Sequence, residues 1–202
     1  MASLVPLSVV GEYRVAAQLA IGFTVAQHYT FLGLPWQMRQ IGALRNPGLG
    51  HSTVIWRQRS LIGMALAALI VLSIGAKYIL ILFGWRFQSL VPVLQLLLLL
   101  RFSDLLWGPQ HEILVSNGRA LEDAHVNMAA IAVWLAAFST VKLALAPIGA
   151  AIVAAGFASV FAQGARRWIL TRAELRAGAG HAFGPALPIA LVVLASIAAI
   201  GL

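Results

Sequence analysis

Two charged residues, Arg101 and Asp104, interrupt a segment that is otherwise almost entirely apolar, residues 90–106. Because they are three positions apart, they lie on one face of a helix and can form an ion pair, which lowers the cost of placing both charges in an apolar environment. Two interpretations remain open. The pair lines a polar cavity, where it contacts an anionic ligand or responds to protons, or it is a structural pair near the end of the segment.

A second set of polar residues, Arg14, Gln18 and His28, lies in the apolar segment 13–34. Arg14 and Gln18 are four positions apart and share a helix face. An arginine on a cavity-facing stripe can bind phosphate through its planar guanidinium. The alternative is that Arg14 extends to the membrane interface, while Gln18 and His28 hydrogen-bond to other helices.

The segments that carry these residues are long and apolar. Of the 202 residues, 61% are hydrophobic and 10% are charged, whereas a soluble domain has about 25% charged residues. A helix needs roughly 20 residues to cross the hydrocarbon layer, and six segments approach that length: 13–34, 61–83, 90–106, 126–146, 150–170 and 185–202. We therefore expect a single all-α integral membrane domain of about six transmembrane helices.

Two connections between these segments are short, so each joins a helical hairpin. Residues 84–89 link the second and third segments, and Pro147-Ile148-Gly149 links the fourth and fifth. In the fifth segment small residues recur every four positions, a spacing that lets two helix backbones approach closely. They are Ala150, Ala154 and Ala158, together with Ala151, Ala155 and Ser159.

The distribution of basic residues predicts the orientation in the membrane. The loops 37–60, 108–125 and 166–184 fall on one side and carry nine arginines, against Arg86, Lys77 and Lys142 on the other side. Cytoplasmic loops are enriched in Arg and Lys, so we expect these three loops to be cytoplasmic and both termini to lie outside. An outside N-terminus would be natural if an earlier span preceded this chain.

Four short motifs resemble, in the same order, stretches of the polysaccharide flippases of the MATE-like (MOP) superfamily. They are Gly11-Glu12-Tyr13-Arg14-Val15-Ala16, Ile81-Leu82-Phe83-Gly84, Leu114-Val115-Ser116-Asn117-Gly118-Arg119 and Ala146-Pro147-Ile148-Gly149-Ala150-Ala151-Ile152. The resemblance covers the C-terminal half of that family. It implies a lobe of a transporter that moves lipid-linked oligosaccharide across the bacterial inner membrane by alternating access.

The resemblance gives the polar residues a role. Arg14, Arg101 and Asp104 would face the cavity and hold the pyrophosphate–sugar head group while the lipid tail stays in the bilayer. One lobe cannot alternate access alone. The chain is then either a truncated product or a half-size protein that pairs with a partner lobe or with itself.

Three other functions remain open: a cation-coupled multidrug exporter lobe, a membrane-embedded glycosyl- or acyltransferase, and a scaffold that transports nothing. The exporter would need an acidic pocket, but the apolar segments contain more Arg and Lys than acids. The transferase would need acids or histidines clustered at one interface, and only the loop 108–125 offers them. Cys is absent, and we find no metal-ligand spacing. We expect a protein that is not an enzyme and has no cofactor, metal or nucleic-acid partner.

Overall fold

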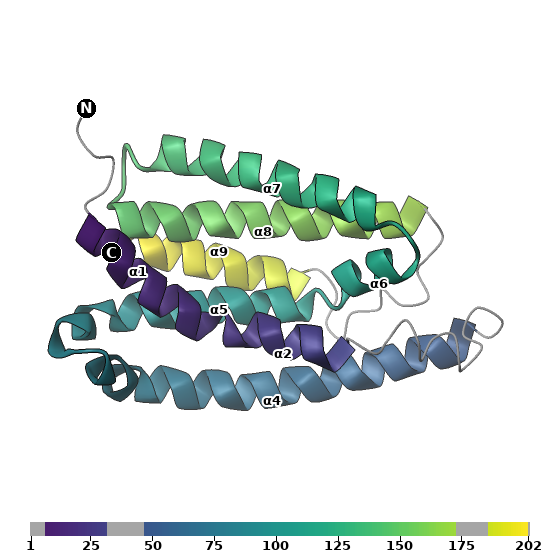
Figure 1. Ribbon diagram of the computed structural model, residues 1–202, viewed down its shortest axis with the longest axis horizontal. Coiled ribbons are helices and arrows are strands. Elements are labelled where there is room, and N and C mark those ends of the chain that lie inside the picture. The colour runs from purple at the N-terminus through teal and green to yellow at the C-terminus, as the bar shows by residue number, and fades with distance from the viewer. Residues whose placement is uncertain (1–6, 32–46, 173–185, 202) are drawn as a thin grey trace.

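The computed structural model describes residues 7–31, 47–172 and 186–201, which form helices and contain no strand (Figure 1). The prediction of an all-helical fold is therefore confirmed. The elements, in chain order, are α1 (Leu7–Ala20), α2 (Gly22–Phe31), α4 (Pro47–Leu82), the short 3₁₀ helix η1 (Trp85–Leu90), α5 (Val91–Leu106), α6 (Gln110–Ser116), α7 (Ala120–Val141), α8 (Pro147–Arg172) and α9 (Ala186–Ile200).

Within the described ranges, four helical stretches are long and apolar enough to cross a membrane. They are Arg59–Leu82, Trp85–Leu106, Ala120–Val141 and Pro147–Arg172. A fifth apolar helix, α9, is shorter. The expected number of about six spans stays a prediction.

Several boundaries differ from those predicted by hydropathy. The first apolar segment bends at Ile21 between α1 and α2, although backbone hydrogen bonds continue across the bend, from Ile21 N–H to Ala17 O (3.0 Å) and from Val25 N–H to Ile21 O (3.1 Å). Helix α4 begins at Pro47, inside the predicted loop 37–60. Proline is well suited to the first turn of a helix, and helical hydrogen bonding does not require apolar side chains. Helix α6 likewise lies inside the predicted loop 108–125.

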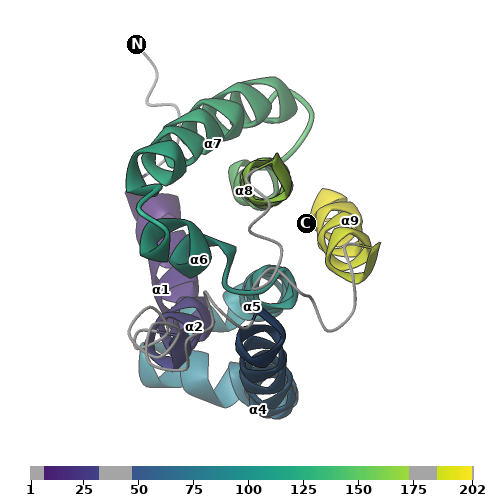
Figure 2. The same cartoon turned by 90° about the vertical axis from the view of Figure 1, so that its right-hand side faces the viewer.

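Helix α5 lies at the centre of the bundle and packs against α1, α2, α4, α8 and α9. Figure 2 shows it between α4 and the pair formed by α8 and α9. Its leucines make up much of the core, with Leu94, Leu98 and Leu105 each 1% exposed. Helix α7, in contrast, packs mainly on α8 and touches α6. The face of α7 toward α1 and α2 is therefore free to border a cavity.

Helices α8 and α9 approach closely, as the small-residue spacing predicts. Ala150 and Ala154 are completely buried. A Cβ atom added at Gly149 would lie 2.6 Å from the carbonyl oxygen of Ala199 on α9. This distance leaves no room for a side chain, so Gly149 determines how near the two helices come.

We expect Gly149→Ala to lower the free energy of unfolding by about 1–3 kcal/mol, the usual cost of overpacking a filled interface. The obstacle is backbone, so no side-chain rotation relieves it. The matched control is Gly164→Ala in the same helix, where nothing lies within 4 Å of the added Cβ and alanine should stabilise by about 0.5–1 kcal/mol. Thermal unfolding in detergent measures both. Equal melting temperatures for the two variants would contradict the close approach.

Candidate functional site

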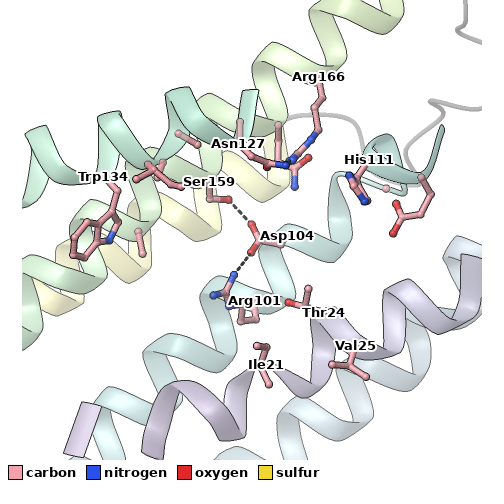
Figure 3. Close-up of a pocket in the computed structure, with 18 of the residues that line it drawn as sticks. Ile21, Thr24, Val25, Arg101, Asp104, His111, Asn127, Trp134, Ser159 and Arg166 are labelled. Carbon is pink, nitrogen blue, oxygen red and sulfur yellow. Dashed lines mark hydrogen bonds and ion pairs between the residues drawn. The ribbon is translucent and has the colours of Figure 1, made fainter. Parts of the chain in front are cut away.

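A cavity of about 1000 Å³ lies among α1, α2, α5, α7 and α8, with α6 at one end (Figure 3). The side chains that α8 turns toward it are mostly small, including Ala155, Ala158 and Ala162, and this is why space remains between the helices. The polar lining residues are Tyr13, Thr24, Tyr29, Arg101, Asp104, His111, Glu112, Asn127, Ser159, Gln163 and Arg166.

The first polar cluster joins α5 to α8. Arg101 Nη1 donates a hydrogen bond to Asp104 Oδ2 at 3.3 Å, and Ser159 Oγ donates to Asp104 Oδ1 (Figure 3). The side chain of Arg101 is 41% exposed and that of Asp104 is 15% exposed. A guanidinium has five N–H donors, so Arg101 keeps donors for a ligand in the cavity while Asp104 balances its charge.

The second polar cluster joins α6, α7 and α8 around Asp123, whose side chain is 3% exposed. Its Oδ1 accepts a hydrogen bond from Arg166 Nε at 2.7 Å. Its Oδ2 lies 2.7 Å from His111 Nδ1 and accepts a hydrogen bond from Asn127 Nδ2 at 3.0 Å. Arg166 also donates to the Asn127 side-chain oxygen. The carboxylate is therefore fully partnered, as a buried charge requires.

The predicted site residues fall into three groups. Arg101 and Asp104 line the cavity and contact each other. Arg14 and Gln18 lie on exposed positions of α1 and are not among the lining residues. Their neighbour Tyr13 is a lining residue, and successive residues on a helix point about 100° apart. His28 falls on α2, and its side chain lies outside what the structure describes.

The residues of the second cluster were not predicted as a site. The prediction that Arg166 begins the loop 166–184 is wrong, because Arg166 lies inside α8 and is 8% exposed. The hydropathy pattern also predicts that His111 and Asp123 lie in the loop 108–125, but they belong to α6 and α7. One signal could have been used: Asp123 and Asn127 are four positions apart at the start of an apolar helix, a spacing that predicts a shared face.

The described part of the chain contains no group of three or more His, Cys, Asp or Glu residues that could hold a metal ion. The chemistry of the cavity is that of two guanidinium groups, hydroxyl and amide groups, an imidazole and two carboxyl groups. The lining thus offers many hydrogen-bonding groups and charges of both signs, and Arg101 is the more exposed of its two guanidinium groups.

No protein family model matches the chain, and no match was found among curated proteins or among solved structures.

Proposed function

We propose that the chain is an integral membrane protein that forms one lobe of an alternating-access transporter, and that its cavity receives the anionic head group of a lipid-linked oligosaccharide. The observation that carries this proposal is the exposed guanidinium of Arg101 inside a polar cavity of about 1000 Å³, within a bundle whose outer faces are apolar. The resemblance of four ordered motifs to stretches of the polysaccharide flippases supports it.

The outer surface supports placement in a membrane. Large apolar side chains are exposed along three helices, for example Ile74 (76%) and Leu82 (85%) on α4, Met128 (70%) and Leu135 (53%) on α7, and Ile197 (60%) on α9. Soluble monomers rarely expose apolar patches of this extent. In a bilayer the same side chains would contact lipid tails, and the helical backbone would have all its hydrogen bonds satisfied internally.

The cavity chemistry supports an anionic sugar-bearing ligand. Arg101 provides an exposed guanidinium group, and guanidinium groups bind phosphate oxygens in bidentate fashion. Trp134 lines the cavity and stacks on Phe138 with a ring-centroid distance of 5.1 Å, so an aromatic face is held in place near the polar groups. The volume is at the upper end of the range for small-molecule sites. A head group with a pyrophosphate and several sugars fits these features better than a compact cation.

The proposed orientation places the basic end of the bundle in the bacterial cytoplasm. Helix α6, the beginning of α4 and the end of α8 lie at one end, opposite η1 and the turn between α7 and α8 (Figure 1). In this arrangement the described basic residues Arg119 and Arg172 would be at the cytoplasmic end, and Arg86 would be outside.

Single cysteines can test this orientation, because the natural chain has none. Ala120 and Ser89 are exposed at opposite ends of the bundle. We expect a membrane-impermeant maleimide to label Ser89→Cys in intact spheroplasts, and Ala120→Cys only after the membrane is opened. Labelling of Ala120→Cys from outside would reverse the orientation, and equal labelling of both from outside would argue against a membrane-spanning protein.

The function itself is tested by binding. The full chain, reconstituted in lipid nanodiscs, is titrated with geranyl pyrophosphate, a soluble isoprenoid with the relevant head group. Geraniol and geranyl trimethylammonium serve as neutral and cationic controls. We expect only the pyrophosphate to bind. Binding of the cation alone would favour the exporter, and binding of none would remove the proposal.

A second candidate, a membrane-embedded transferase, is favoured by one observation. His111 Nδ1 lies 2.7 Å from Asp123 Oδ2, and His111 lines the cavity. A carboxylate that fixes one ring nitrogen leaves the other available as a general base. Arg166 and Asn127 also donate hydrogen bonds to the Asp123 carboxylate. The contact between His111 and Asp123 therefore fits a structural role equally well. Turnover of a lipid-linked sugar or acyl donor that is lost in His111→Gln would establish the transferase.

A further inference from the structure

The carboxyl group of Asp104 is held in a way that makes its charge depend on Arg101. Its Oδ2 accepts from Arg101 Nη1 at a rather long 3.3 Å, and its Oδ1 accepts from the neutral hydroxyl of Ser159. Arg101 is thus the only cation hydrogen-bonded to Asp104 among the described residues, and it is also the best placed to bind an anion, because 41% of its side chain is exposed.

An anion that binds Arg101 changes the surroundings of Asp104. The guanidinium positive charge is then shared between the anion and the carboxylate. The bound negative charge also repels the carboxylate at short range. Both effects favour the neutral, protonated form of Asp104. By linkage, a protonated Asp104 in turn strengthens binding of the anion.

We propose that Asp104 is a proton-binding site coupled to the anion site, so that binding of a phosphate-bearing ligand at Arg101 is accompanied by uptake of one proton by Asp104. The proton is delivered through water that enters the cavity: one O–H bond breaks in a hydronium ion, which becomes water, and one O–H bond forms on the carboxylate of Asp104. This inference rests on the proposed function. It extends that function by naming the ion that moves with the substrate.

Other titratable groups border the same cavity and must be separated from Asp104. They are Tyr13 on α1, Tyr29 on α2, His111 and Glu112 on α6, and Arg166 on α8. Arg166 is engaged by Asp123, and α9 carries no charged residue. His111 and Glu112 are therefore the other groups that could account for proton uptake when the anion binds.

The experiment is calorimetric titration of the full chain in nanodiscs with geranyl pyrophosphate, in two buffers of different ionisation enthalpy, between pH 6.5 and 8.5. At the upper end of this range the probe is fully ionised and takes up no proton itself. We expect uptake to approach one proton per bound molecule as the pH falls, and the association constant to rise by up to about tenfold per pH unit, the limit for one linked proton.

Three variants assign the proton. Asp104→Asn imitates the protonated side chain, so it should bind at pH 8.5 at least as tightly as the natural protein and with no proton uptake. His111→Gln and Glu112→Gln should both retain the uptake. Binding of the probe without proton uptake overturns this inference but leaves the proposed function standing. Uptake that persists in Asp104→Asn overturns it as well, and absence of any binding overturns both.

Discussion

Removing the Arg101 guanidinium is expected to weaken binding of geranyl pyrophosphate by about 10- to 100-fold, since a hydrogen bond to a charged group contributes roughly 1.5–3 kcal/mol. The change is best made as Arg101→Gln together with Asp104→Asn. Both members of the ion pair then become neutral, and no buried charge is left without its partner. Equilibrium titration of the full chain in nanodiscs gives the dissociation constants of the double variant and of its reference, Asp104→Asn alone.

The reference for this comparison is Asp104→Asn alone, which keeps the guanidinium. A second control, Arg86→Gln, removes a basic residue from η1, where it lies over the ring of Phe87 at 4.8 Å and is not part of the cavity lining. We expect that control to bind like the natural protein. If the double variant binds as tightly as Asp104→Asn, Arg101 does not hold the anion, and the cavity needs another ligand.

Replacing Arg166 by glutamine is expected to lower the free energy of unfolding by about 3–5 kcal/mol, because it leaves the Asp123 carboxylate buried without its cation. The two side chains are 9% and 3% exposed, and Arg166 Nε lies 2.7 Å from Asp123 Oδ1. Chemical unfolding in detergent micelles measures the loss. The double variant Arg166→Gln/Asp123→Asn should recover most of the lost free energy of unfolding, because the unpaired charge of the Asp123 carboxylate is then removed as well.

Arg119→Gln is the matched control, since Arg119 also pairs with a carboxylate, that of Glu122, at 3.0 Å. Those side chains are 37% and 44% exposed, and surface ion pairs contribute only about 0–1 kcal/mol. Similar losses in the free energy of unfolding for Arg119→Gln and Arg166→Gln would show that the buried Asp123–Arg166 pair stabilises the packing of α7 on α8 no more than a surface ion pair does.

The sequence allowed the positions of the long helices to be predicted because their apolar side chains are consecutive. The segment predicted at 90–106 is helix α5, Val91–Leu106, almost to the residue. Arg101 and Asp104 could be paired from sequence because their three-residue spacing is local. Hydropathy was a poorer guide to where helices end. Helix α4 starts at Pro47 and α6 lies in a polar stretch, since backbone hydrogen bonding tolerates polar side chains outside a membrane.

The second polar cluster could not be predicted from spacing. Asp123 and Arg166 are 43 residues apart, and only the packing of α7 on α8 brings them together. The same holds for Ser159 and Asp104, 55 residues apart. Local spacing does not predict that Ser159, one of the regularly spaced small residues of α8, contacts the Asp104 carboxylate. Nor could it show that Arg14 and Gln18 lie away from the cavity, because that depends on how α1 is rotated against α5.

The length of α4 has a consequence for motion. Its 36 residues make a rod of about 54 Å at 1.5 Å per residue, against a hydrocarbon layer of about 30 Å. In a bilayer, the stretch from Pro47 to Arg59 would project by roughly 18 Å beyond the apolar stretch Arg59–Leu82. If that span tilted by about 20°, a usual angle for membrane helices, the Pro47 end would swing sideways by about 6 Å. A spectroscopic label near this end would magnify a rocking movement of the lobe that is small at the cavity itself.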